Sequence, residues 1–156
     1  SAVLAGDSPS ARASQRGFDL GFEAIPHPDN SLDYITAYDL LEHIPRHGGV
    51  SPNRNPFLYL MSEIHRCLKP GGSFYARTPA YPNPTAFSDP THVNFITSDT
   101  ARYFGTERLG DGTLLRDDKY DLGQRYGFKG HFLIVRNHHE AAYGHQVWLM
   151  TKTPQL

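Results

Sequence analysis

A chain of 156 residues has the size of one domain, and such a domain buries about two-thirds of the surface that its unfolded chain exposes. Its 15 basic and 16 acidic residues leave a formal net charge of -1, so charge gives no reason to expect binding to nucleic acid or to a membrane. The single cysteine, Cys67, excludes an intrachain disulfide framework and favours a reducing, cytoplasmic setting, and no apolar run reaches transmembrane length.

The first quarter of the chain predicts two short strands around a helix. Residues 2–6 are an apolar run that ends at Asp7, and a Ser-Pro pair then begins a helix over residues 8–15. Residues 18–25 predict a second strand. It is a weak one, because Gly21 is unfavourable inside a strand.

The second quarter carries the clearest periodicity. Apolar and β-branched residues over 32–37 predict a buried strand, and Asp39 is placed to cap a helical turn that ends before Pro45. Residues 56–68 repeat their apolar positions at helical spacing, and the following Pro-Gly-Gly ends that helix sharply before a strand over 73–78.

The second half of the chain is less regular. Residues 80–94 contain three prolines and no period, which predicts an ordered loop, and loops of this length in compact domains are often functional. Residues 105–119 are polar and predict no regular element. The elements predicted here are a short helix that ends at Phe104, a helical turn or two over 120–126, and a pair of strands over 132–135 and 146–151.

Strands that alternate with helices and then end in a strand pair are typical of the α/β class. We therefore expect a three-layer sandwich with a mostly parallel sheet and a C-terminal antiparallel pair, built as a single domain over residues 1–156. The carboxyl ends of the parallel strands are where such sheets place their ligands.

Two segments in register resemble a known family. The segment DNSLDYITAYDLLEHI over residues 29–44, followed by EIHRCLKPGGSFYARTP over residues 63–79, resembles class I methyltransferases that use S-adenosylmethionine. The resemblance is closest to the small-molecule methyltransferases with a Rossmann-like domain, and it extends from about Ala2 to Phe104, with the later strand pair also fitting the family.

The chain departs from the family at its glycine-rich motif. The family holds the methionine end of its cofactor on such a loop after the first strand, and no G-x-G-x-G occurs in this sequence. If residues 2–6 are the family's second strand, the first strand is missing and the domain is N-terminally incomplete. The alternative is that residues 2–11 themselves take the first-strand position with a degenerate loop.

The resemblance also implies a set of cofactor-binding residues. An acidic residue would hold the ribose hydroxyls, two residues would line the adenine, and three would lie beneath the cofactor at the end of the central strand. In that order they are Asp7, Phe22, Glu23, Thr36, Ala37 and Tyr38. Each has an ordinary structural alternative, such as an N-cap for Asp7 or a half-buried core position for Tyr38.

The residues with the most distinctive chemistry follow the same strand. Asp39, Glu42 and His43 share one face of a helical turn, and His92 lies in the proline-rich loop. Carboxylates with imidazoles suit a divalent cation, and some methyltransferases with a similar turn and a later histidine resemble this arrangement. Without a metal, His43 or His92 is the candidate general base. A helix cap and packing pair remains the structural alternative for Glu42 and His43.

These observations predict a methyltransferase that acts on a hydroxyl of a small molecule or sugar, with Tyr81, Phe87, Phe95 and Tyr103 near the acceptor. Two other functions stay open. One is a binding or scaffolding domain that kept the fold without cofactor or catalysis, and the weaker one is a metal-dependent hydrolase. The sequence does not indicate the oligomeric state.

Overall fold

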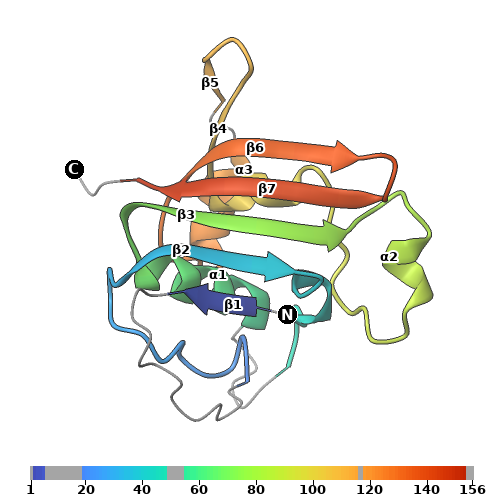
Figure 1. The fold of residues 1–156 in the computed structure, drawn as a ribbon, viewed down its shortest axis with the longest axis horizontal. Helices are drawn as coiled ribbons and strands as arrows, with labels where there is room; N and C mark the ends of the chain where they lie inside the picture. The colour runs from blue at the N-terminus through green and yellow to red at the C-terminus, as the bar shows by residue number, and fades with distance from the viewer. Residues whose placement is uncertain (1, 6–18, 49–54, 116–117, 154–156) are drawn as a thin grey trace.

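The computed structural model describes residues 2–5, 19–48, 55–115 and 118–153. These residues form a seven-stranded sheet of order β1-β2-β3-β7-β6-β4-β5 (Figure 1). The strands are β1 (Ala2–Ala5), β2 (Leu32–Tyr38), β3 (Leu68–Pro79), β4 (Gly105–Arg108), β5 (Leu114–Leu115), β6 (Phe132–Glu140) and β7 (His145–Lys152). The helices are α1 (Pro56–Cys67), α2 (Thr85–Ser88) and α3 (Asp118–Arg125), and two 3₁₀ segments are η1 (Leu41–His43) and η2 (Thr100–Phe104).

The β2–α1–β3 unit confirms the central prediction from the sequence. The two strands are parallel, with Ile35 opposite Phe74, and α1 connects them. The Asn55 side chain caps α1 by accepting a hydrogen bond from the backbone N–H of Leu58 at 3.1 Å, and Pro56 takes the first helical position, where a missing N–H costs nothing.

The predicted C-terminal strand pair is also present. β6 and β7 are antiparallel, and β7 pairs in turn with β3, so the pair joins β3 to the far half of the sheet. Strands β2, β3, β6 and β4 run in one direction, whereas β1, β7 and β5 run opposite to it. The α/β class and the open Rossmann-like sheet are thereby confirmed, and the sheet is a mixed one.

β1 lies beside β2, in the position that the first strand of the family would take. It runs antiparallel to β2, with Ala2 opposite Ala37, whereas a β-α-β connection would have made the two strands parallel. The predicted helix over residues 8–15 and Asp7 lie outside the described residues.

Three predictions of local structure were wrong. Residues 19–25 form a turn, in which the N–H groups of Phe22 and Glu23 both donate to the carbonyl oxygen of Asp19, where a strand was predicted. Residues 105–115 contain the antiparallel β4–β5 pair, where no regular element was predicted. A turn followed by a strand from residue 73 was predicted after α1, but β3 begins at Leu68, directly after the helix. The pairing of β2 with β3 shifts in register between Leu32 and Tyr34 of β2.

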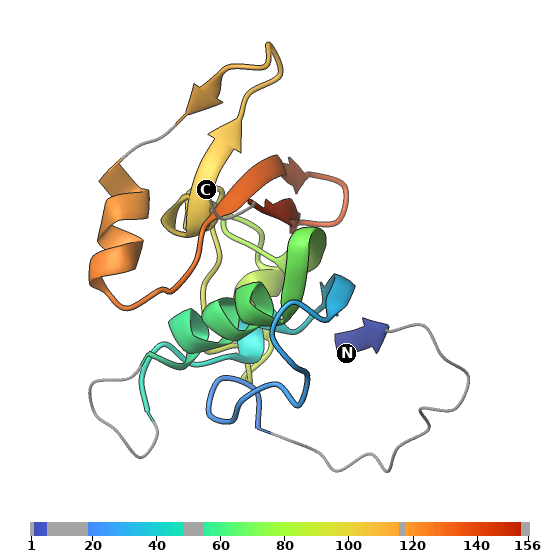
Figure 2. The same cartoon turned by 90° about the vertical axis from the view of Figure 1, so that its left-hand side faces the viewer.

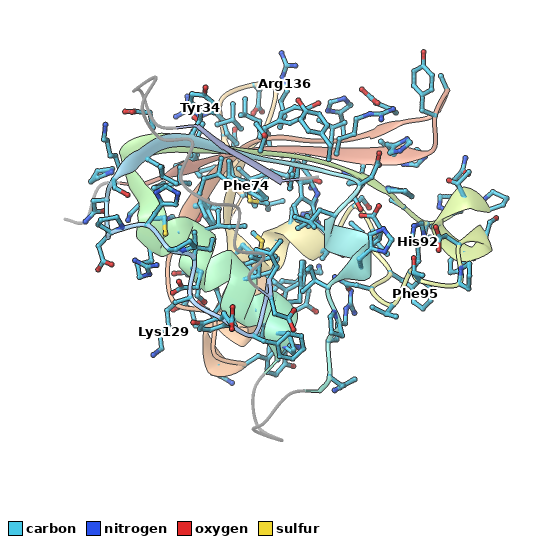
Figure 3. All side chains as sticks on the ribbon, turned by 60° about the horizontal axis from the view of Figure 1, so that its bottom comes forward. Tyr34, Phe74, His92, Phe95, Lys129 and Arg136 are labelled. Atoms are coloured by element: carbon cyan, nitrogen blue, oxygen red, sulfur yellow. The ribbon has the colours of Figure 1, made fainter. Side chains whose placement is uncertain are left out.

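The helices α1 and α3 lie on the same face of the sheet (Figures 1 and 2). Figure 3 shows Phe74 between the sheet and α1, whereas Tyr34 and Arg136 lie on the opposite face. Phe74 is fully buried, but Tyr34 and Tyr38 are about half exposed, so in the described part of the chain only one face of the sheet is covered by helices. None of the described helices is long and apolar enough to cross a membrane.

Candidate active site

Two segments meet at the carboxyl ends of β2 and β3. The 3₁₀ segment η1 follows β2, and the proline-rich loop with α2 follows β3, at the same edge of the sheet (Figure 1). This shared edge was predicted from the sequence, because parallel strands end at the same side of a sheet.

Hydrogen bonds fasten the proline-rich loop to η1. The backbone N–H groups of Val93 and Asn94 both donate to the carbonyl oxygen of Glu42 at 2.9 Å. The Asn94 side chain donates to the carbonyl oxygen of Leu41 and accepts from the Arg46 guanidinium at 2.6 Å. The position of His92 relative to η1 is therefore set by the backbone contacts of the two residues that follow it.

The Glu42 carboxylate is the most buried ionisable group at this edge, with 2% of its side chain exposed. Its Oε2 accepts a hydrogen bond from the Thr78 hydroxyl at 2.6 Å. Its Oε1 has no hydrogen-bond partner among the described residues and lies 3.9 Å from the Nε2 atoms of both His43 and His92. A buried carboxylate oxygen without a partner is unusual and points to a functional role.

The two imidazoles face each other across this carboxylate. Their ring centroids are 4.9 Å apart in an edge-to-face arrangement, and Figure 3 shows His92 at the end of the sheet. The His43 Nδ1 contacts Thr91, and the His92 Nδ1 lies 3.1 Å from the carbonyl oxygen of Ala86. The structure thus brings together Glu42, His43 and His92, which we call the Glu-His-His cluster.

Asp39 does not join the cluster, so its prediction as a metal ligand and helix cap was wrong. Its backbone has a φ of +45°, in the left-handed region that Asp tolerates better than most residues. Its Oδ1 lies 3.3 Å from the Nε2 of His145, at the start of β7. The 3₁₀ segment instead begins after Leu40 without a side-chain cap.

Asp89 supports the cluster from the loop. Its Oδ1 accepts hydrogen bonds from the Thr91 hydroxyl at 2.6 Å and from the Thr91 N–H at 2.8 Å, and these bonds lower the pKa of the Asp89 carboxyl. Its Oδ2 lies 4.0 Å from the Nε2 of His92. A carboxylate therefore lies on the more exposed side of the cluster.

The predicted cofactor residues are only partly placed to act. Thr36, Ala37 and Tyr38 end β2 at the site's edge, but Tyr38 points to the uncovered face and packs on Tyr75, with ring centroids 5.5 Å apart. The N–H groups of Phe22 and Glu23 are used within their own turn, so they do not offer free donors to an adenine. The described residues thus hold no full cradle for S-adenosylmethionine.

Three exposed aromatic residues lie beside the cluster. Tyr81, Phe87 and Phe95 are each about half exposed, and Phe87 stacks on Phe95 with centroids 5.0 Å apart. Phe87 follows Ala86, whose carbonyl contacts His92. Tyr103, which was predicted to join them, belongs to η2 and stacks on Tyr126.

A cavity lies elsewhere in the described part of the chain. It has a volume of about 1020 Å³ and is lined by α1, residues 126–130 and Lys152, at the opposite edge of the sheet. The Lys152 ammonium already donates to the carbonyl oxygens of His65 and Leu68, where it caps α1. We place the site at the Glu-His-His cluster, because among the described residues only there does a buried carboxylate oxygen lack a partner beside two imidazoles.

Sequence reasoning missed two residues that shape the site, Thr78 and Thr91, and it missed His145, which contacts Asp39 outside the cluster. Thr91 was within the quoted Asp-Pro-Thr-His segment, and its neighbour Asp89 signals a side-chain turn that fixes it. Thr78 is the last residue but one of β3, and no local pattern indicates that it faces Glu42. His145 meets Asp39 only through the strand order.

Comparison with known families finds a match over part of the chain. Residues 8–76 match the family described as a methyltransferase domain. The match covers less than half of the chain, and over those residues it supports the resemblance to methyltransferases. No curated protein matches the chain.

Several solved structures are similar to this chain at low identity. One is the [4+2]-cyclase SpnF, at 13% identity and a TM-score of 0.49, with 88% of this chain and 56% of that chain covered. Another is a complex of the Haloferax volcanii Trm112 methyltransferase activator with a methyltransferase, at 12% identity and a TM-score of 0.43, with 83% and 58% covered. This chain therefore spans less than two-thirds of the length of these neighbours.

Proposed function

We propose that this chain forms the acceptor side of a methyltransferase that uses S-adenosylmethionine and methylates a hydroxyl of a small molecule or sugar. The observation that carries the proposal is the buried Glu42 carboxylate, with His43 and His92 beside it at the carboxyl edge of β2 and β3. Ligands of open α/β sheets bind at that edge. A hydroxyl acceptor is favoured because it must lose a proton, and the cluster provides groups that accept one.

The chemistry asked of these residues is modest. The sulfonium cofactor supplies an already activated methyl group, so the protein has to hold the acceptor oxygen in line and receive its proton. The Nε2 of His43 or His92 would take that proton as the acceptor oxygen gains the methyl group. Glu42, buried and anchored by Thr78, would stabilise the resulting imidazolium.

The aromatic residues of the loop support a small organic acceptor. Tyr81, Phe87 and Phe95 expose rings next to the cluster, and half-exposed aromatic faces pack well against sugars and other partly apolar molecules. Arg46 donates to the carbonyl oxygen of Phe95 at 2.7 Å, which holds that part of the loop in place. The loop thereby forms a fixed wall.

Calorimetric titration of the full natural protein with S-adenosylhomocysteine tests the proposal. We expect saturable binding that His92→Gln leaves within a few-fold, because His92 lies on the acceptor side. Absence of binding would overturn the methyl-donor assignment. It would instead support a methyltransferase-like binding domain, which the internal hydrogen bonds of Phe22 and Glu23 favour as the second candidate.

A further inference from the structure

The Glu-His-His cluster directs three polar atoms at one point. The Oε1 of Glu42 lies 3.9 Å from the Nε2 of His43 and 3.9 Å from the Nε2 of His92, and all three ligand atoms lie within 4.8 Å of one another. No described residue donates a hydrogen bond to that Oε1, although the Glu42 side chain is 98% buried. A buried charged oxygen requires a partner.

Hydrogen bonds at the opposite ring nitrogens determine the tautomers of both histidines. The His92 Nδ1 lies 3.1 Å from the carbonyl oxygen of Ala86, and the His43 Nδ1 lies 3.2 Å from the carbonyl oxygen of Thr91. A carbonyl oxygen only accepts, so each Nδ1 must carry the proton. In both neutral rings, the Nε2 therefore holds a lone pair.

The Thr91 hydroxyl supports the same tautomer for His43. It donates its own proton to the Oδ1 of Asp89 at 2.6 Å, so it can only accept at its 3.1 Å contact with the His43 Nδ1. When both rings are neutral, two lone pairs and a carboxylate oxygen face one another. Metal-binding histidines characteristically have this arrangement, with the second ring N–H donated to a backbone carbonyl.

We propose that Glu42 Oε1, His43 Nε2 and His92 Nε2 bind one divalent transition-metal ion of the zinc or manganese type. An ion equidistant from the three atoms would lie roughly 2.5 Å from each, so shifts of about half an ångström give normal bond lengths. Two imidazoles favour such ions over Mg²⁺ and Ca²⁺, which prefer oxygen ligands.

The ion would leave positions open on the exposed side of the cluster. His43 has 36% of its side chain exposed, and the Asp89 carboxylate, at 49%, is placed to accept a hydrogen bond from a group bound there. This inference rests on the proposed function for its role and changes one step of it. With the ion bound, both Nε2 atoms are ligands and neither takes the proton; an acceptor hydroxyl on the ion becomes more acidic, is held in place, and releases its proton to solvent. The binding of the ion itself does not depend on that role.

Zinc titration of chelator-treated protein tests the site. We expect saturable Zn²⁺ binding that persists in a large excess of Mg²⁺, and a loss of affinity of at least about 100-fold in Glu42→Gln and in His92→Gln. The matched control is His145→Gln, since His145 lies at the same sheet edge and contacts Asp39 outside the cluster. The control should bind Zn²⁺ as the unmodified protein does.

A second measurement on the unmodified protein does not depend on how the variants fold. Nitrogen-15 spectra of the histidines should show two rings protonated at Nδ1 without metal, and Zn²⁺ should shift the Nε2 signals of those two rings. A proton shared between an imidazolium and Glu42, with no response to Zn²⁺, would overturn the proposal. Zinc binding without binding of S-adenosylhomocysteine would keep the metal site and refute only the proposed methyl transfer.

Discussion

Thr78 is the residue on which the orientation of the Glu42 carboxylate depends. Its hydroxyl is fully buried and donates to Oε2 at 2.6 Å, so Oε1 is turned toward the two imidazoles. We expect Thr78→Val, which keeps the shape and removes the hydroxyl, to lower the free energy of unfolding by about 1–3 kcal/mol, because the buried carboxylate then has two unpaired oxygens. Urea denaturation measures this change.

Thr151→Val in β7 is the matched control for that substitution. It makes the same chemical change in a neighbouring strand, at a partly buried position away from the cluster. We expect its free energy of unfolding to stay within about 0.5 kcal/mol of the unmodified protein. A Thr78→Val protein as stable as this control would contradict the role assigned to Thr78.

His65 makes the stability of the fold depend on pH. Its ring lies against those of Phe128 and Phe132, and burial, with a smaller effect of Lys152, lowers its pKa from 6.5 to about 4. The unfolded chain takes up a proton near pH 6.5, but folded His65 does so only near pH 4. The stabilisation is therefore complete above pH 6.5 and is lost as the pH falls toward 4.

Urea denaturation at a series of pH values checks this dependence. Between pH 6.5 and 4, the free energy of unfolding should fall by roughly 2 kcal/mol less in His65→Gln than in the unmodified protein. This figure allows for solvent screening. His138→Gln, on the exposed part of β6, should leave the slope unchanged. Equal slopes in all three proteins would refute the assignment to His65.

At the scale of elements, the predictable parts were those encoded by local pattern. α1 has a cap at Asn55, a proline at its first position and an apolar face, and β2 and β3 have buried alternating runs. The predictions that were wrong concern segments whose structure depends on partners distant in the sequence. β4 is a strand because Gly105 pairs with Phe132, and the turn over residues 19–25 is held against α1 by the Ile25 N–H bond to Glu63.

The same distinction applies to the candidate site. Spacing placed Glu42 and His43 on one turn, and the common edge of parallel strands placed His92 near them. The prediction that Asp39 joins them was wrong, because its left-handed backbone directs the carboxylate to His145. His145 belongs to an antiparallel strand more than 100 residues later. A local pattern contains no information about such a neighbour.

The contact between α3 and η2 depends on Gly123. A Cβ at this glycine would collide with the carbonyl oxygen of Tyr103. Gly→Ala in a helix ordinarily stabilises by up to about 1 kcal/mol, but here the collision with backbone reverses the sign. We expect Gly123→Ala to lower the free energy of unfolding by about 1–3 kcal/mol, as measured by urea denaturation.

Gly110→Ala provides the comparison for Gly123→Ala. Gly110 has nothing within 4 Å of its Cβ position, so the added methyl group meets open space. Its free energy of unfolding should change by less than about 0.5 kcal/mol. If both variants are equally stable, α3 shifts freely over η2 and the close contact is not important for the fold.

At the scale of the whole molecule, one hydrophobic core joins elements from both halves of the sheet. Trp148 in β7 is fully buried and is the sequence's only tryptophan. Its ring centroid lies 6.4 Å from that of Phe104 in η2, and Phe104 in turn packs edge-to-face on Phe57 of α1. The fluorescence of Trp148 therefore reports on contacts between the two halves.

A single core predicts a single unfolding transition, which tests the expectation of one domain. We expect urea curves followed by Trp148 fluorescence and by far-ultraviolet circular dichroism to coincide. Phe104→Leu should lower both midpoints together, by about 1–2 kcal/mol of unfolding free energy, because it removes ring contacts at the centre of the core. Tyr143→Leu, at an exposed turn, should move neither. If Phe104→Leu shifted the fluorescence curve alone, the chain would comprise two separately folding units.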